Sequence, residues 1–443
     1  MRFKSLRDGK VGIKNIILSV CMIVKNEEKF LEKCLASLGS LADEVVIGDT
    51  GSTDKTPEIA RDWGARVLNI PWTNNFAAAR NTVIDHARGK WILSIDADER
   101  IHPISKTEIL PAFQDASKMA FQSFLLPKKG LTPQHAIRIF RNDPRIRYRG
   151  IIHENIISGL NQAISESGGE IGKLPCVFDH FGYERKRVKK HHRDFPLLLS
   201  DLKINPENTH ILRHLGLVYK HLNQIPQAEE TWRKAIDIIR LKERIEPRNS
   251  LAYIDLIKCL QVQGKTTRLL LDEAIKTFPD NPVLFFLNGR EFISEGRFLK
   301  AIPVFKRLLK WGEEKNYDCS ISYDARIFAA HALISLAACY FLICDFSESK
   351  LYCEKALKCD PENLNAKIFF DLLTSRERLP HHNVFSRKKD FNLARIRIRE
   401  LSLDRKINPG EIKKIFGGFK GIHETDSDER YNNYGYRVLA GSY

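Results

Sequence analysis

The sequence has no closely spaced cysteine pair and no long hydrophobic run. Its nine cysteines are scattered over 443 residues without a C-x-x-C spacing. This pattern favours reduced thiols in a cytoplasmic compartment over a disulfide scaffold. The uncharged run from Asn15 to Val24 is shorter than the ~20 residues that a membrane span needs. No signal-peptide pattern precedes it, so we expect a cytoplasmic protein whose first apolar run is a buried strand.

Nucleic-acid-binding motifs are also missing. The chain carries 71 Lys and Arg against 55 Asp and Glu, a formal charge of +16, yet it has no zinc-finger spacing and no RNP-like aromatic motif. The charge therefore predicts an anionic partner, such as a phosphorylated substrate or an anionic membrane surface, and no nucleic acid. Basic clusters at residues 184–193 and 385–389 are equally typical of a solvated surface.

Residues 16–100 alternate short apolar runs with helical patterns. The runs include IILSVCMIV, EVVIGD, RVLNIPW and WILSIDAD, and segments such as EEKFLEKCLASLGSL and FAAARNTVIDHARG lie between them. This rhythm predicts a Rossmann-like α/β domain with a parallel sheet, whose ligands bind beyond the carboxyl ends of the strands. Asp49, Asp96 and Asp98 fall at or just after predicted strand ends. We therefore expect all three at the binding edge.

The pattern becomes helical from about Lys203, and it repeats. Gly216, Ala228 and Trp232 match Gly289, Ala301 and Phe305 at a constant offset, and a second offset brings Tyr219 onto Tyr340. Small and aromatic residues at these positions resemble the tetratricopeptide repeat, a pair of helices of ~34 residues. Residues 251–275 look like a weaker copy. We expect about four degenerate repeats, which are enough to bury a continuous core.

The segment KWILSIDADER, residues 90–100, ends an apolar run with two carboxylates one residue apart. If the strand continues through them, Asp96 and Asp98 point the same way, because alternate residues of a strand share a face. Two like charges at that separation repel each other unless a cation lies between them. Hard carboxylate oxygens suit Mn²⁺ or Mg²⁺. The pair therefore predicts a site for one of these ions.

Four segments follow one another along residues 16–100: VKNEE, VVIGDTGSTDKT, NFAAARN and SIDADER. Their order and wording resemble family 2 glycosyltransferases, which have the A-type fold and transfer a sugar from a nucleotide sugar. The resemblance covers residues 16 to about 183 and implies nucleotide contacts from Asn26, Glu28, Asp49 and Asp54. For Asp54 the alternative is a cap on the helix that starts near Pro57. For Glu28 it is an acidic first turn that complements the helix dipole.

The same resemblance assigns roles around the carboxylate pair. Asp96 and Asp98 would hold the divalent cation, which offsets the charge that grows on the leaving nucleotide, and Asp96 also lies beside the donor. Arg80 could donate a bidentate contact to the diphosphate, or form a salt bridge on the helix surface. His180 would complete the metal site or touch the diphosphate. A lone histidine is also commonly a structural residue.

Two later segments point to a branch of the family. Residues 136–155, AIRIFRNDPRIRYRGIIHEN, and residues 178–184, FDHFGYE, resemble motifs of lipopolysaccharide-core glucosyltransferases and bacteriocin S-glycosyltransferases. Members of this branch can carry a helical repeat domain. An inverting transfer needs a base for the acceptor proton, and Glu154 is the candidate, with His153 next. A structural His-Glu turn is the alternative. The chain has RGIIHE where smaller residues are usual, which leaves the acceptor's shape open.

Together these patterns divide the chain into four segments. Residues 1–15 are an N-terminal extension, residues 16–195 a family 2 catalytic domain, residues 203–375 the repeats, and residues 376–443 a basic tail of unknown fold. We expect an inverting, metal-dependent transfer of a hexose, with UDP as the favoured nucleotide. The acceptor would be a saccharide, peptide or protein held by the repeats. The alternative is a non-catalytic repeat scaffold that carries a degenerate nucleotide-sugar-binding domain, and it predicts damaged metal and base positions.

Overall fold

The computed structural model describes residues 16–127, 130–182 and 187–363, together with 366–367, 369–370 and 373–374. The predicted extension at residues 1–15 and the predicted tail at 376–443 lie outside the described residues. The chain forms two compact units. The first reaches Leu256 and includes Cys319–Ile321, and the second holds the other residues from Ile257 onward.

The first unit is built on a mixed sheet of eight strands in the order β3-β2-β1-β4-β7-β6-β8-β5. The strands are β1 (Leu18–Val24), β2 (Glu44–Asp49), β3 (Arg66–Asn69), β4 (Trp91–Ser94), β5 (Glu99–Ile101), β6 (Lys118–Leu126), β7 (Gln134–Arg141) and β8 (Glu170–His180). The strands β1 to β4 run parallel, which confirms the predicted α/β class. Strand β7 then pairs antiparallel with β4 and β6. The parallel strands β1 to β4 are therefore joined by the strands β5 to β8, whose pairing the alternation of strands and helices did not predict.

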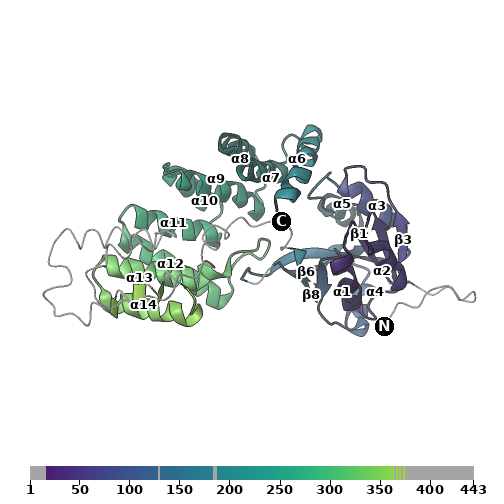
Figure 1. The fold of residues 1–443 in the computed structure, drawn as a ribbon, viewed down its shortest axis with the longest axis horizontal. Coiled ribbons are helices and arrows are strands. Elements are labelled where there is room, and N and C mark those ends of the chain that lie inside the picture. Colours follow the sequence, from purple (N-terminus) through teal and green to yellow (C-terminus); the bar gives the residue numbers. More distant parts are fainter. Residues whose placement is uncertain are drawn as a thin grey trace, which may run out of the picture. The chain divides into compact units, whose positions relative to one another are not determined.

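Helices cover both faces of the parallel half (Figure 1). On one face, α1 (Glu28–Leu38), α2 (Thr56–Asp62) and α4 (Lys106–Gln114) bury residues such as Leu31, Ala60 and Phe113 in one core cluster. On the other, α3 (Phe76–Asp85) and α5 (Ile157–Ser167) contribute Val83 and Leu160 to a second cluster. Burial on both faces explains why β1, β2 and β4 are near-continuous apolar runs in the sequence.

The first unit continues into three helices. These are α6 (Arg187–Ile204), α7 (Thr209–His221) and α8 (Ile225–Arg240). Ile152, in the loop that follows β7, packs in one hydrophobic cluster with Leu198 of α6 and with Ile211 and Leu215 of α7. The domain boundary predicted between residues 195 and 203 falls within α6, and it stays a prediction.

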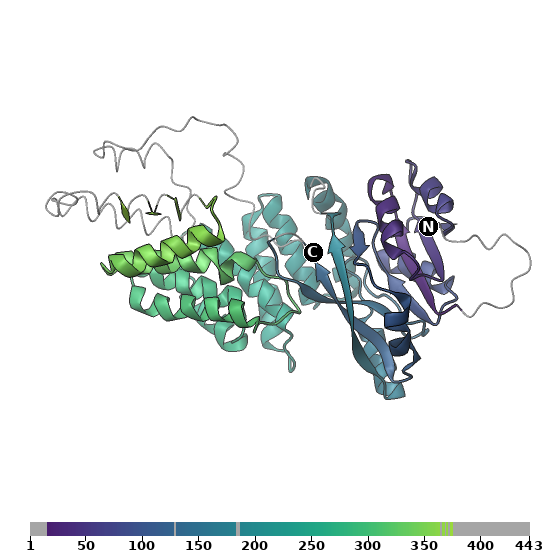
Figure 2. The ribbon, with the colours of Figure 1, turned by 90° about the horizontal axis from the view of Figure 1, so that it is seen from below.

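Further helices follow, and those after residue 262 lie in the second unit. They are η2 (Pro247–Asn249), α9 (Ser250–Val262), α10 (Arg268–Thr277), α11 (Pro282–Ser294), α12 (Phe298–Glu314), η3 (Ala325–Phe328), α13 (Ala330–Leu342) and α14 (Phe346–Cys359). Figure 2 shows the green helices α11 to α14 of the second unit stacked side by side. Helix α7 packs on α8, α11 on α12 and α13 on α14, which are the pairs that the two sequence offsets predict, while the weaker copy at residues 251–275 stays a prediction.

Two glycines show why the sequence repeat produces a structural repeat. A Cβ atom on Gly216 of α7 would collide with the indole of Trp232 of α8. A Cβ on Gly289 of α11 would lie 2.5 Å from the ring of Phe305 of α12. In both pairs the missing side chain lets an aromatic ring of the second helix press against the first helix. The predicted match of Gly216 with Gly289 and of Trp232 with Phe305 is therefore confirmed.

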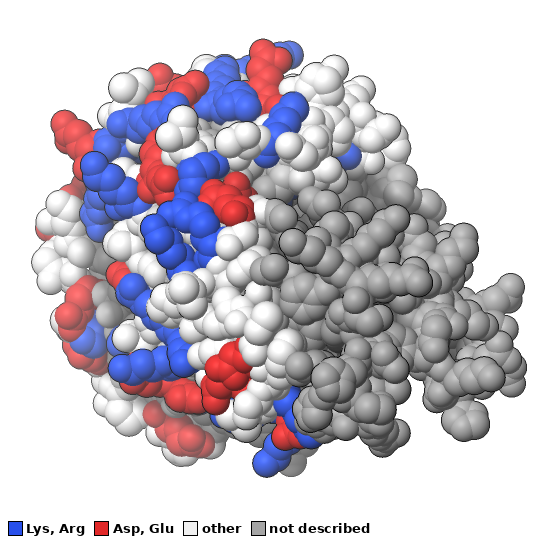
Figure 3. All heavy atoms as spheres, turned by 90° about the vertical axis from the view of Figure 1, so that its left-hand side faces the viewer, with Lys and Arg blue, Asp and Glu red and all other residues white. Residues whose placement is uncertain are grey.

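Two surface properties bear on the partners. Among the described residues no helix is both long and apolar enough to cross a membrane. On the face that Figure 3 displays, Lys and Arg side chains lie among Asp and Glu side chains. Such interspersed charge is typical of a solvated surface.

Candidate active site

The site lies where the parallel strands end. Asp49 is the last residue of β2 and is aligned with Val24, the last residue of β1. Asp96 follows the end of β4 by two residues. Since the carboxyl ends of parallel strands meet at one edge of a sheet, these carboxylates share the binding edge that the sequence predicts.

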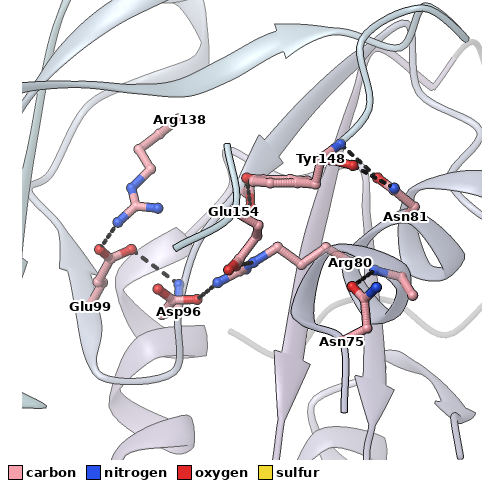
Figure 4. Close-up of polar contacts among 10 residues, drawn as sticks. Asn75, Arg80, Asn81, Asp96, Glu99, Arg138, Tyr148 and Glu154 are labelled. Carbon is pink, nitrogen blue, oxygen red and sulfur yellow. Dashed lines mark hydrogen bonds and ion pairs between the residues drawn. The ribbon is translucent and has the colours of Figure 1, made fainter. Parts of the chain in front are cut away.

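Arg80 is the centre of the site (Figure 4). Its Nη2 donates to Oδ1 of Asp96 at 2.8 Å, and its Nε donates to Oε1 of Glu154 at 2.6 Å. The side chains of Arg80 and Glu154 are only 12% and 10% exposed. Burial by itself lowers the pKa of the Arg80 guanidinium. The negative charges of Asp96 and Glu154 outweigh this effect and raise that pKa. At Asp96 burial raises the pKa of the carboxyl group, but the positive charges of Arg80 and Arg138 outweigh burial and lower it. The site therefore holds a charged guanidinium bridging two carboxyl groups.

Local structure fixes Arg80 in this position. Asn75 caps the start of α3 by accepting the Ala78 N–H at 2.9 Å, a contact worth about 1 kcal/mol. The guanidinium carbon lies 5.3 Å from the centre of the Tyr148 ring. Asn81, the next residue, donates to the Tyr148 carbonyl and accepts its N–H, at 2.9 and 2.8 Å. The Tyr148 hydroxyl donates to Ser94 Oγ at 2.8 Å, which ties this segment to the end of β4.

Glu99 and Arg138 form a second, buried ion pair that the sequence analysis missed. Arg138 Nη2 contacts Glu99 Oε1, and Glu99 is fully buried. The other oxygen of Glu99 accepts the Asp96 N–H at 3.1 Å. Burial raises the pKa of Glu99 to about 7, against the opposing charge of Arg138. Glu99 thus orients the backbone of Asp96, and Arg138 adds positive charge behind it.

Asp98 faces His180 instead of Arg80. Asp98 Oδ1 lies 3.6 Å from His180 Nε2, because β5 and β8 align Glu99 with His180. The Asp98 carbonyl accepts the Phe181 N–H at 2.8 Å, and a Cβ on Gly182 would collide with the Asp98 carboxylate. The structure thus brings Asp98 and His180 together, and their role as metal ligands stays a prediction. Both glycine and histidine of the sequence FDHFGYE pack against this carboxylate.

One expectation about the carboxylate pair is wrong in its geometry. Strand β4 ends at Ser94, and Asp96–Asp98 form a turn before β5 begins at Glu99. The alternation of a strand therefore does not set the direction of these side chains. Asp96 and Asp98 instead contact different partners, Arg80 and His180. Two carboxylates and an imidazole are nevertheless a donor set that suits Mn²⁺, and their oxygens suit Mg²⁺.

The predicted nucleotide residues form a separate network between the ends of β1 and β2. Asn26 Oδ1 accepts the Thr53 N–H at 2.7 Å, and Asp54 accepts the N–H groups of Glu28 and Thr56 at 3.2 and 3.0 Å. Asp49, which is buried, accepts the Ser52 hydroxyl at 2.5 Å. Glu28 accepts the Lys55 N–H at 3.3 Å. Asp54 therefore contacts the backbone at the first residues of α1 and α2, while the N-cap positions of these helices are Glu27 and Lys55.

The two candidate bases point to different places. Glu154 contacts Arg80, whereas the ring of His153 stacks on His214 of α7 with centroids 3.7 Å apart. The backbone explains this divergence, because His153 has a φ of 54°, a left-handed conformation that non-glycine residues seldom adopt. Glu154 is joined to the Asp96 side chain through a shared partner, Arg80.

The chain is similar to several known proteins. Residues 19–167 match the profile of glycosyl transferase family 2. The chain is 26% identical over 54% of its length to the prophage-derived glycosyltransferase SunS of Bacillus subtilis, covering 57% of it. It is 36% identical over 45% of its length to a TPR repeat-containing protein of Synechococcus elongatus, covering 51% of it. The chain thus spans little more than half the length of these two relatives.

A third relative is covered more fully. The lipopolysaccharide core biosynthesis glycosyltransferase LpsC of Rhizobium meliloti is 32% identical over 38% of this chain, and the match covers 67% of that protein. The matched family profile begins in β1 and ends in α5, so it includes Arg80, Asp96 and Glu154. With a profile match over the α/β sheet and a relative covered to this extent, the chain belongs to glycosyl transferase family 2.

Proposed function

We propose that this chain is an inverting, metal-dependent glycosyltransferase that moves a hexose from a nucleotide sugar, UDP-linked by the family resemblance, to a saccharide, peptide or protein. The observation that carries the proposal is the bridge from Asp96 through Arg80 to Glu154. It joins a carboxylate at the donor edge of the sheet to the candidate base. Reactants held between the two would meet in a fixed orientation, which is a large part of catalysis by proximity.

The donor side would use the strand ends. The nucleotide would lie against the loop shaped by Asn26, Glu28, Asp49 and Asp54, with its diphosphate toward Asp96. Asp96, Asp98 and His180 would hold Mn²⁺ or Mg²⁺, which, when bound, offsets negative charge on the leaving nucleotide. The structure supports this assignment through the chemistry of the donors and through the 3.6 Å approach of Asp98 to His180.

The acceptor side would use Glu154. Arg80 holds Oε1 of this carboxylate, which leaves Oε2 as the atom that takes the acceptor proton. In an inverting transfer the deprotonated acceptor attacks from the face opposite the leaving nucleotide. Arg80 would also turn toward the diphosphate as a bidentate donor, in exchange for one of its carboxylate contacts. His153 is the weaker candidate for the base, since its ring lies against α7.

The helical repeats would hold the acceptor. Concave surfaces of stacked helix pairs are a common site for peptides, and the basic composition suits a phosphorylated saccharide or a peripheral contact with an anionic membrane surface. All nine cysteines are free thiols. This supports a cytoplasmic location, because free thiols persist in reducing compartments.

The competing function is a repeat scaffold with a degenerate sugar-nucleotide domain. It predicts loss of metal-binding or base residues, whereas Asp96, Asp98 and Glu154 are all present and Arg80 joins two of them. The deciding experiment incubates the full-length protein with UDP-hexoses in Mn²⁺ or in EDTA. We expect slow donor hydrolysis in Mn²⁺ alone, with the released sugar first appearing in the anomer opposite to the donor by NMR. No turnover of any nucleotide sugar would favour the scaffold.

A further inference from the structure

Three histidines lie close together where the loop of residues 149–155 meets α7. His210 and His214 lie one turn apart on α7, and His153 comes from the loop that also carries Glu154. One ring nitrogen of each lies within 4.8 Å of the other two. The centroid of the His153 ring is 3.7 Å from that of His214 and 5.5 Å from that of His210. The spacing of His210 and His214 places two imidazoles on one helix face, as in helical metal sites.

Several contacts hold the loop of residues 149–155 against α6 and α7. Its ends are joined by the bridge between Arg149 and Asn155. Asp201 of α6 accepts the Ile151 N–H at 2.6 Å, and Ile152 packs with Ile211 of α7. The left-handed φ of 54° at His153 then directs its ring to α7, while the next residue contacts Arg80. A conformation of this kind costs of order 1 kcal/mol or more and persists where surrounding contacts enforce it.

The charged neighbours of the cluster are Arg213 and Arg248, whose positive charges act on His210. Arg213 is the nearby cation on α7, and its charge is offset by Asp255, whose Oδ2 lies 2.7 Å from Arg213 Nε with both side chains buried.

We propose that His153, His210 and His214 bind a borderline divalent cation, best matched by Zn²⁺, which fastens the Glu154 loop to α7. Imidazole suits Zn²⁺, while the oxygens of Asp96 and Asp98 suit Mn²⁺ or Mg²⁺, so the two sites differ in metal preference. Zinc holds nitrogen at about 2.0–2.1 Å, and tetrahedral ligands then lie about 3.4 Å apart. The ring nitrogens spread to 4.8 Å, and His153 and His214 are stacked, so one of these two rings turns out of the stack to bring its nitrogen to a shared ion. The proposal is independent of the transferase reaction.

The test measures metal binding by the full-length protein after removal of bound metal with a chelator. Zn²⁺ is titrated in competition with a chromophoric chelator, and Co²⁺ is titrated by its visible absorption. We expect one tight Zn²⁺ site in the wild type, lost in His210→Ala and in His214→Ala with more than a tenfold fall in affinity. Two controls, His86→Ala at an exposed histidine and Asp98→Asn in the carboxylate site, retain it. Zn²⁺ raises the melting temperature of the wild type and of both controls only.

Several results would overturn the proposal. They are equal Zn²⁺ stoichiometry and affinity in the wild type and both α7 variants, and wild-type binding only at millimolar Zn²⁺. The exposed thiols of Cys344 and Cys359 are removed by Ser substitution in all proteins, so that they do not contribute. If the α7 variants fail to fold, the wild-type Co²⁺ spectrum decides. Intense bands of four-coordinate Co²⁺ with nitrogen ligands are expected, and weak six-coordinate bands would contradict the site.

Discussion

Arg80 donates from Nε to Oε1 of Glu154 at 2.6 Å, although 74 residues separate the two along the chain. The same guanidinium reaches Asp96 through Nη2. A residue in the middle of α3 thus joins the turn after β4 to the loop after β7. The carboxylate after β4 and the candidate base are therefore one charged assembly, and a change at Arg80 should disturb both.

Arg80→Lys should lower turnover at least tenfold while the protein stays folded. Lysine keeps the charge but lacks the planar fork that contacts two carboxylates at once. Arg80→Ala should in addition lower the melting temperature, because an unpaired buried carboxylate costs about 3–5 kcal/mol. Turnover and thermal unfolding are measured side by side. Arg145→Lys, which alters a surface contact with Glu166, is the control, and equal losses in both lysine variants would contradict the assembly.

Glu99 should make stability depend on pH. Its pKa is about 7 in the folded protein and near the ordinary 4.5 when unfolded. Between these values the folded state binds more protons, so the free energy of unfolding falls as pH rises. Glu99→Gln cannot ionise and should remove about 1–3 kcal/mol of that fall between pH 5 and 7.5. Urea unfolding in EDTA measures it. Identical pH profiles for wild type and variant would refute the effect of burial.

Glu154→Gln should lower turnover by ~10² to 10⁴, the range of a lost general base, with affinity for the nucleotide sugar nearly unchanged. Glutamine keeps the shape and can still accept from Arg80, but it cannot take the acceptor proton. The measurement is turnover against pH with a melting curve for each protein. Glu166→Gln at an exposed carboxylate is the control. Wild-type turnover at every pH would remove Glu154 from the mechanism.

Gly216→Ala should destabilise the protein by about 1–3 kcal/mol, the usual range for overpacking. The added methyl group collides with the Trp232 indole. Replacing that indole by Leu should relieve the collision, so the two substitutions together should cost less than their sum. A double-mutant cycle by chemical denaturation measures the coupling. Strict additivity would show that the helices shift apart instead of pressing together.

Much of the site followed from local sequence patterns. Apolar runs followed by a carboxylate placed Asp49 and Asp96 at or just after strand ends, and the structure has Asp49 at the end of β2 and Asp96 two residues past β4. The glycine and aromatic positions of the repeats were equally readable, because one close approach of two helices needs both residue types. In each case the pattern and its structural cause lie within a few tens of residues of one another.

The missed features depend on contacts between distant strands. Glu99 and Arg138 meet because β4 pairs with β7 and β5 pairs with β8, a strand order that no local pattern predicts. The one signal in the sequence was Arg138, the first arginine of the RIFR segment in β7. The divergence of His153 from Glu154 has its cause in one backbone dihedral angle. An Asp-Ala-Asp sequence likewise does not reveal that its strand stops two residues earlier.

The most direct test of the central claim is cleavage of a UDP-hexose by Asp98→Asn, compared with the wild type and with Asp62→Asn at an exposed position on α2. Each protein is assayed over a range of Mn²⁺ concentrations and in EDTA. The proposed site predicts that Asp98→Asn loses more than 90% of the Mn²⁺-dependent turnover with an unchanged melting temperature, while Asp62→Asn behaves as wild type. Equal Mn²⁺-dependent turnover by all three proteins would contradict the assignment of Asp98 to the metal.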